Sequence, residues 1–509
     1  MKNLTFKHFF ISLLVVLLFV IKLHINNFLM AENGDTYDFF KISFQISQGN
    51  FFYESKRLPL YSLLLAPFNS EDYVFYGRII NNLIYFLSVF FFYKLISYKF
   101  KLELAEKILF TGIFAFNFVI FDNSFFILSD SLLLLLAILF LYLYEKNYSI
   151  FLLTIIGSLA FYTRFEGALL IGSLVLLKLF QKKYIEIIKI SILFLLLAIP
   201  LLLRLYLTSQ SDANYLEDQA GFILSTKNIL KAFGSLFFAT GGFWLLGVYL
   251  SDKNNQNLIQ KPKELIKYLS TNIYEIIFIL FSVLLILWGF YIRLYTVPIM
   301  ICILYYIRFL KSDIKISMVW LSAIPMLFFI YNVQVLDHFD LGFYKYSKVL
   351  AVILSLVILI VISYKKLNIR PKIYITSVLI ILLNLFIFFE KFFATNYKYY
   401  TIVQASEFAL KNNLQNVAYF DESGVQKWYF KDFDSKYNYF LSRESLTNWL
   451  IQNQINYLMI SDEMGYKMGQ IDKAKKDIEK LEIVAEFNSN YSGGRTVIYK
   501  LENHRIKQQ

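Results

Sequence analysis

The chain has 509 residues, of which 58% are hydrophobic, 19% aromatic and only 17% charged, with a mean hydropathy of +0.53. Soluble domains carry about 25% charged residues, so this composition excludes a soluble globular protein of this size and indicates a polytopic membrane protein. The net charge is +13, but the Lys and Arg residues occupy short loops and form no basic face for nucleic acid; anionic membrane lipids are the expected counter-charge.

Apolar runs of membrane-spanning length recur from the N-terminus to about residue 394. A spanning helix needs about 20 mainly apolar residues. The first run follows Lys2 and Lys7 and is longer than the apolar core of a signal peptide, so we expect a retained helix with a cytoplasmic N-terminus. The thirteen predicted spans are 9–29, 76–98, 107–122, 128–145, 149–163, 166–181, 186–207, 231–250, 272–292, 294–310, 316–334, 346–364 and 371–391.

The charges between these spans favour one orientation. Lys and Arg gather in every loop that this threading places inside, and acids gather in the loops that it places outside. An odd number of spans puts the C-terminus outside. The weakest span is 231–250, which contains four glycines, and reading it as a re-entrant segment would invert the topology after it.

The composition changes after about residue 394, where polar residues become common and apolar runs shrink to the length of strands. Helical apolar spacing covers 403–414 and 442–455. The expected strands are 416–420, 456–461, 482–487 and 495–501. We therefore predict a membrane domain over residues 1–394 and a small extracytoplasmic α/β domain over residues 395–509.

The first outer loop carries several polar groups at the membrane edge. Asp35 and Asp38 follow the first span, whereas Glu32 reads as its polar flank. Arg57 then precedes the short apolar stretch LPLYSLLLAPF, which Pro59 and a second proline bound, and we expect a helix that lies in the membrane interface. An Arg at headgroup level suits a phosphate group, and it suits equally an anchor that reaches lipid headgroups.

Two further outer segments contain charged residues. Asp130 opens the fourth span within SDSLLLLL, either as a helix N-cap or as a second carboxylate on the same side as Asp35. Arg164 and Glu166 share a very short outer turn, where they either pair with each other or face one cavity.

A late outer loop, VLDHFDLGFYKYSK, holds acidic, aromatic and basic residues. The side chains of Asp337, His338 and Asp340 are of types that bind metals, so binding of a divalent metal ion in this loop stays a possible alternative. No HExxH pattern is present. No other cofactor is predicted, because the chain has no P-loop, GxGxxG, GxSxG or CxxC pattern. The single cysteine, Cys302, excludes a disulfide within one chain and a cysteine-based metal site.

The order of these features resembles the GT-C superfamily of integral membrane glycosyltransferases. The resemblance is greatest to the branch of the protein O-mannosyltransferases and the lipid A aminoarabinose transferase. In chain order, the motifs that carry it are GDTYDFFKIS, RLPLYSLLLAPF, YGRIINNLIYFL, SDSLLLL, TRFEG and GFYKYSKVL, followed by a small outer domain. The resemblance covers nearly all of the membrane part.

The resemblance implies a hexosyl- or pentosyltransferase in the inner membrane of a bacterium. It would move a sugar from a polyprenyl-phosphate donor, with inversion, to a hydroxyl of a glycolipid such as lipid A, of a glycan or of a protein. By position, Asp35 matches the general base, Arg57 the residue that holds the leaving phosphate, and Asp130 an acid that shapes the sugar or acceptor site. The remaining candidate substrate-binding residues are Asp38, Arg164, Glu166, Tyr344, Lys345 and Tyr346.

Two other functions stay open. A transporter or flippase for lipid-linked saccharides would carry charges near the middle of its spans and often internal repeats, whereas here the charges crowd the outer edge and no repeat is visible. A polymerase or ligase of surface glycans usually has its large outer loop between late spans, whereas here the larger soluble part is C-terminal.

Overall fold

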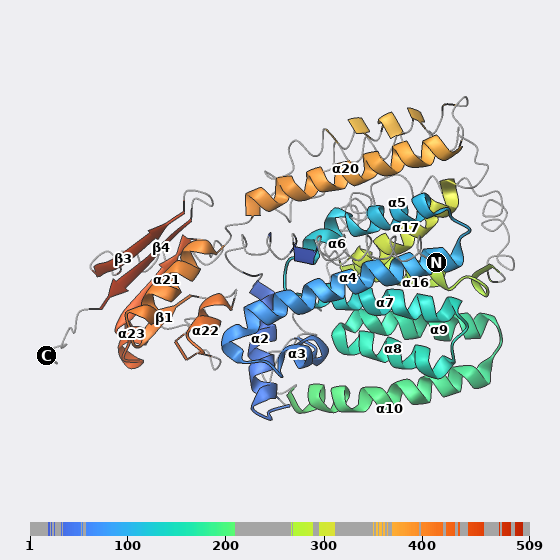
Figure 1. The fold of residues 1–509 in the computed structure, drawn as a ribbon. Coiled ribbons are helices and arrows are strands. Elements are labelled where there is room, and N and C mark those ends of the chain that lie inside the picture. Colours follow the sequence, from blue (N-terminus) through green and yellow to red (C-terminus); the bar gives the residue numbers. More distant parts are fainter. Residues whose placement is uncertain are drawn as a thin grey trace, which may run out of the picture. The chain divides into compact units, whose positions relative to one another are not determined.

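The computed structural model describes residues 34–51, 57–208, 268–288, 295–310, 369–395, 399–420, 424–432, 446–462, 481–489 and 494–501, with scattered residues between them. These residues form two compact units (Figure 1). The first unit comprises Met1–Asn50, Leu65–Arg78 and Phe392–Gln509, and the second comprises Phe51–Leu64 and Ile79–Lys391.

The second unit is built from apolar helices, with the start of α4 and the end of α20 belonging to the first unit. Within it α7 packs against α8 and α17, and α8 packs against α9 and α10. The helices are α3 (Pro59–Leu65), α4 (Tyr73–Lys99), α5 (Leu104–Ala115), α6 (Phe118–Asn123), α7 (Ser129–Glu145), α8 (Ile150–Thr163), α9 (Ala168–Phe180), α10 (Tyr184–Thr208), α16 (Ile273–Trp288), α17 (Thr296–Leu310) and α20 (Ile369–Thr395).

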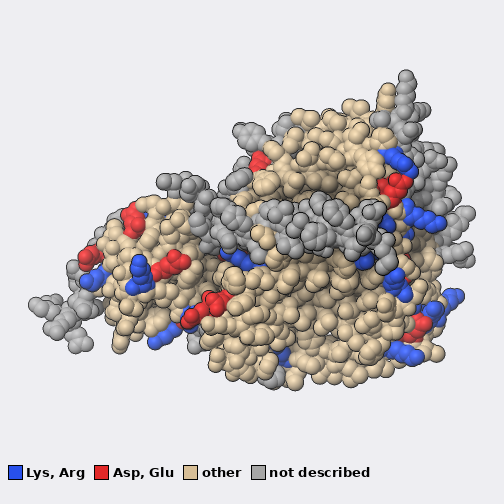
Figure 2. Space-filling model, viewed as in Figure 1, with Lys and Arg blue, Asp and Glu red and all other residues tan. Residues whose placement is uncertain are grey.

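The predicted helical membrane class agrees with this unit. Ser70–Lys99, Tyr184–Arg204 and Arg370–Glu390 are long and apolar enough to cross a membrane. Leu195, Leu196 and other apolar residues of α10 are exposed, as lipid-facing side chains are. Figure 2 shows a wide surface over these helices without charged side chains among the described residues.

Most predicted spans that fall on described residues coincide with one helix each. The number of thirteen is not established, since 231–250 and 316–334 lie outside the described residues, as do most of 9–29 and part of 346–364.

The predicted span 107–122 is wrong as a single helix, because the chain breaks there into α5 and α6. The side chain of Asn117 caps α6 by accepting a hydrogen bond from the Val119 N–H at 3.1 Å. Asn384 on α20 accepts another from the Phe118 N–H at 3.0 Å. These two amides supply the partners that a broken helix lacks in an apolar surrounding.

The first unit contains a mixed sheet in the order β1-β2-β4-β3, in which β1 and β2 are parallel and the other pairs antiparallel. The expected strands and both expected helices of this region are present, whereas α22 was not predicted. The elements of this unit are α2 (Gly34–Ser47), η1 (Ser70–Asp72), α21 (Tyr400–Lys411), β1 (Val417–Tyr419), α22 (Val425–Tyr429), α23 (Leu446–Gln452), β2 (Tyr457–Ser461), β3 (Glu482–Asn488) and β4 (Arg495–Lys500).

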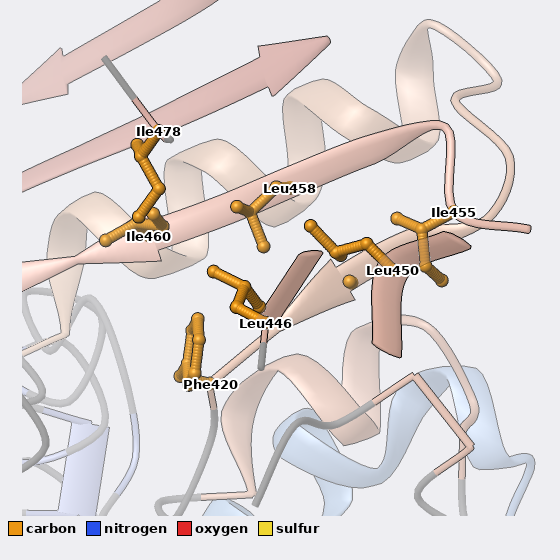
Figure 3. Close-up of a cluster of buried hydrophobic side chains, with 8 residues drawn as sticks. Phe420, Leu446, Leu450, Ile455, Leu458, Ile460 and Ile478 are labelled. Atoms are coloured by element: carbon orange, nitrogen blue, oxygen red, sulfur yellow. The ribbon is translucent and has the colours of Figure 1, made fainter. Parts of the chain in front are cut away.

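Apolar side chains cover both faces of this sheet. Leu458 and Ile460 of β2 point to one face, where Leu446 and Leu450 of α23 pack against them (Figure 3). Met459 points to the other face and packs with residues of α21, as the alternation of a strand requires. We call residues 399–501 of this unit the C-terminal α/β fold; the predicted domain boundary at residue 394 stays a prediction.

Candidate functional site

Helix α2 carries the first pair of candidate carboxylates. Asp35 lies in its first turn, where the partial positive charge of a helix N-terminus stabilises a carboxylate. Asp38 lies three residues later, so both side chains occupy the same side of the helix. Both residues are half-buried, whereas Tyr37 and Phe40 are fully buried. The acids are therefore on the more accessible side of a helix whose aromatic side is packed.

An aromatic cluster holds the buried side of α2. The ring centroid of Phe40 lies 4.8 Å from that of Trp428 on α22 and 5.9 Å from that of Tyr73 at the start of α4. The rings of Tyr73 and Trp428 are stacked, with centroids 5.5 Å apart. Aromatic pairs of this kind contribute about 0.5–1.5 kcal/mol each beyond the burial of their surface. Two segments that are distant in sequence, α22 and the start of α4, thus fix the helix that carries Asp35.

Glu32 is more than the polar flank that the sequence suggested. Its side chain is 1% exposed, and its Oε1 accepts a hydrogen bond from Arg78 Nε on α4 at 2.7 Å. A buried, hydrogen-bonded ion pair is strongly destabilised when one partner is removed, so this pair ties the segment before α2 to α4. The sequence feature that could have indicated this pair is Arg78, since a charged residue in an apolar span needs a partner.

The second unit brings together Asp130, Arg164 and Glu166. The N-cap position of α7 is Leu128, so the interpretation of Asp130 as the N-cap is wrong. Instead, Arg164 Nη1 lies 3.3 Å from Asp130 Oδ1. The same guanidinium donates to both oxygens of Glu166, from Nη2 at 3.1 Å and from Nε at 3.3 Å. One arginine therefore joins the two buried carboxylates. Arg164 and Glu166 pair with each other, which is the first alternative for the outer turn.

One oxygen of this cluster has no hydrogen-bond partner in the described part of the chain. Asp130 Oδ2 is buried and accepts no hydrogen bond from any residue that the structure describes. An unsatisfied buried acceptor is costly, and among the described residues the one guanidinium of Arg164 pairs with both carboxylates of this cluster. Asp130 Oδ2 is thus suited to a hydroxyl or a cationic donor from a bound molecule. Among the described residues no group of three or more His, Cys, Asp or Glu side chains could hold a metal ion.

The turn that carries Arg164 depends on a glycine. The Gly167 N–H donates to the Arg164 carbonyl at 2.9 Å. A Cβ at Gly167 would lie 2.1 Å from the backbone carbonyl of Ala160 on α8, which no side chain can accept. Only glycine therefore allows the turn to close against α8 and direct Arg164 at both carboxylates.

Gly167→Ala is expected to destabilise the protein by well over the ~1 kcal/mol that an ordinary glycine-to-alanine effect involves. The measurement is thermal unfolding of the purified protein in detergent. Gly172→Ala on α9 is the matched control, because among the described atoms its Cβ would meet only Leu280 Cδ1, at 3.9 Å. Equal melting temperatures for the two variants would contradict this account of the turn.

Arg57 lies two residues before α3, the helix predicted in this loop, which begins at Pro59. The next residue, Leu58, is buried in a cluster with Phe161 of α8 and Leu201 of α10. The backbone that carries Arg57 is therefore anchored to two helices, while its own side chain is half-buried.

Arg204 is a second basic residue beside this loop, and the sequence reading missed it. It is buried on α10, and its Nη2 donates to the Tyr53 carbonyl at 3.1 Å. The position of Arg204 within an apolar run could have marked it as a candidate functional residue.

The remaining candidates divide as follows. Asp35 and Asp38 belong to the first unit, and Arg57, Asp130, Arg164 and Glu166 to the second. The late-loop candidates Tyr344, Lys345 and Tyr346, with the acid and histidine residues Asp337, His338 and Asp340, lie outside the described residues.

No family model matches the chain, and no curated protein is significantly similar to it in sequence. Two solved structures share its fold. Both are of ArnT from Cupriavidus metallidurans, one bound to undecaprenyl phosphate and one in the apo state. Each aligns with a TM-score of 0.55 and 12% sequence identity, covering 95% of this chain and 97% of that chain. The expected resemblance in fold is thereby confirmed, and the likeness fits a polytopic membrane protein.

Proposed function

From this shared fold, we propose that the chain is a membrane glycosyltransferase. It moves a sugar from a polyprenyl-phosphate donor to an acceptor hydroxyl on the extracytoplasmic face, with inversion. The observation that carries the proposal is the likeness over 95% of the chain to a protein whose solved structure contains undecaprenyl phosphate. Turnover of an undecaprenyl-phosphate sugar by the purified chain tests it, because a flippase would leave the donor intact.

Asp35 is the proposed general base. As the acceptor oxygen bonds to the anomeric carbon, Asp35 takes the proton of the hydroxyl. The bond between that carbon and the phosphate oxygen breaks, and its electron pair leaves with the lipid phosphate. Attack from the face opposite the leaving group inverts the configuration. The place of Asp35 in the first turn of a helix whose aromatic side is packed supports this role.

Arg57 is the proposed phosphate-binding residue. The phosphodiester of the donor already carries one negative charge, and a second develops on the phosphate as the sugar leaves. A guanidinium stabilises this growing charge through paired charge-assisted hydrogen bonds. The anchoring of Leu58 between α8 and α10 supports this role, since it fixes the backbone from which Arg57 extends.

Arg57→Ala is expected to weaken binding of undecaprenyl phosphate about 10- to 100-fold, because a hydrogen bond to a charged group contributes about 1.5–3 kcal/mol. The measurement is titration of the purified protein with undecaprenyl phosphate, followed by native mass spectrometry. Arg370→Ala removes the same charge from an exposed pair with Glu103 and should leave the affinity unchanged. Equal affinities for the two variants would remove Arg57 from the phosphate site.

The cluster of Asp130, Arg164 and Glu166 is proposed to bind the sugar or the acceptor. Its two carboxylates suit hydroxyl or ammonium donors, and Asp130 Oδ2 has no hydrogen-bond partner among the described residues. The acceptor class, whether glycolipid, glycan or protein, is not distinguished by this chemistry. The late loop, where the sequence leaves a divalent metal ion as an alternative, lies outside the described residues.

A multi-pass inner-membrane location with the C-terminus outside completes the proposal. Contacts between loops and helix ends that the threading places on the same side support it. Lys99 Nζ lies 2.7 Å from Glu145 Oε1 and 3.8 Å from the ring centroid of Tyr274, and all three belong to predicted inner ends. Gln181 Nε2 donates to the Ser270 carbonyl at 2.8 Å, which joins two further inner loops.

A further inference from the structure

The C-terminal α/β fold reaches α2 through Gly424, which precedes α22. Gly424 has φ +79°, a left-handed conformation that favours glycine. A Cβ there would lie 3.2 Å from Tyr37 Cβ, 3.7 Å from the Gly34 carbonyl oxygen and 4.0 Å from Asp38 Oδ1. These three residues surround Asp35 in the first turns of α2. The backbone at Gly424 therefore lies directly on the turn that carries the proposed base.

Trp428 makes a second contact one helical turn later. It is 6% exposed, and its ring packs against Phe40 on the second turn of α2 and stacks on Tyr73. The two contacts together hold α2 at successive turns, so α22 restricts both its position and its rotation.

The position of α22 depends in turn on the sheet. Gln426 is buried, and its Nε2 lies 2.8 Å from Met459 Sδ on β2. The hydroxyl of Tyr419 on β1 donates to Asp432, directly after α22, and the Tyr437 N–H donates to the same carboxylate at 3.0 Å. A continuous series of contacts thus runs from the sheet through α22 to α2.

We propose that the C-terminal α/β fold contributes to catalysis, because its helix α22 positions α2 and thereby Asp35. This inference rests on the proposed function. Gly424 and Trp428 are positioning residues, since they act through Asp35. A general base must lie within hydrogen-bond reach of the proton that it takes, so a shift of α2 lowers kcat and leaves the KM for the donor unchanged.

Gly424→Ala tests this role against Gly49→Ala. Gly49 has φ +81°, and no described atom lies within 4 Å of its Cβ position. Both variants therefore strain a left-handed residue, but only Gly424→Ala adds a Cβ against the first turns of α2. For an undecaprenyl-phosphate sugar that the wild type consumes, Gly424→Ala should lower kcat about 10- to 100-fold, with KM unchanged and Gly49→Ala close to wild type. Equal kcat values for the two variants would overturn the proposal.

A double-mutant cycle separates positioning from general damage. In an Asp35→Asn background, Gly424→Ala should cause no further loss of the residual rate, because the base that it displaces is already absent. If the two losses multiply instead, Gly424 does not act through Asp35 and the proposal is overturned.

The contact itself is testable without any activity. Tyr37→Cys with Gly424→Cys, in a Cys302→Ala background, should form a disulfide on mild oxidation, because their Cβ atoms lie near the ~3.5–4.5 Å that disulfides require. Each single variant should form none. Failure to cross-link overturns the positioning role. If the double-cysteine variant cross-links but the wild-type protein consumes no donor, the contact between Gly424 and α2 is real. The proposed function is then overturned, and the positioning role falls with it.

Discussion

Asp35→Asn is expected to lower the rate of sugar transfer by about 10²- to 10⁴-fold, the usual contribution of a general base. The amide has nearly the shape of the carboxylate and still accepts a hydrogen bond, but it does not take the proton of the acceptor. Binding of undecaprenyl phosphate should be unchanged, since Arg57 carries that contact. The measurement is steady-state transfer by the purified variant, with lipid binding determined on the same sample.

Asp38→Asn is the matched control for this loss. Asp38 is on the same side of α2 and equally half-buried, so its replacement changes the charge of the helix by the same amount. We expect a far smaller loss than for Asp35→Asn. If Asp38→Asn shows the larger loss, the base is Asp38; a wild-type rate for Asp35→Asn would remove Asp35 from the mechanism.

Arg164→Leu is expected to destabilise the protein by about 3–5 kcal/mol, because it leaves the buried carboxylates of Asp130 and Glu166 without their common partner. The measurement is chemical or thermal unfolding in detergent. Arg495→Leu breaks an exposed pair with Glu486 and should change stability by only about 0–1 kcal/mol. Equal stability of the two variants would show that the cluster is not held by Arg164.

Neutral replacements provide the matching rescue. Asp130→Asn and Glu166→Gln, added to Arg164→Leu, remove both uncompensated charges and should restore most of the lost stability. Sugar transfer should stay low in this triple variant, because the charge proposed to bind sugar or acceptor is gone. A triple variant no more stable than Arg164→Leu would mean that the loss comes from packing.

Local pattern was enough to predict much of the fold. Apolar run length predicted most helices of the second unit, and short apolar runs of strand length predicted β1 to β4. The cluster on Arg164 was partly predictable, because Glu166 is only two residues away and both lie in a short turn. For Asp130 the sequence predicted only that it lies on the outer side of the membrane, and its ion pair with Arg164 was not predicted.

The remaining features depend on contacts between distant segments. Glu32 and Arg78 are 46 residues apart, and no periodicity connects them. The break between α5 and α6 is stabilised by Asn384, from a helix late in the chain. Helix α22 has only five residues, too few to show a period, and its place follows from Trp428 packing on α2. Such elements are set by tertiary packing, which a local reading does not contain.

The most direct test of the central claim is donor consumption by the purified full-length protein in liposomes, using a panel of undecaprenyl-phosphate sugars with glycolipid, glycan and protein acceptors. The proposed function predicts that at least one donor releases undecaprenyl phosphate and that its sugar appears on an acceptor with inverted configuration. Asp35→Asn should lower the rates of both by about 10²- to 10⁴-fold. Donor that crosses the bilayer intact, with no undecaprenyl phosphate released from any sugar, would contradict a glycosyltransferase and identify a flippase.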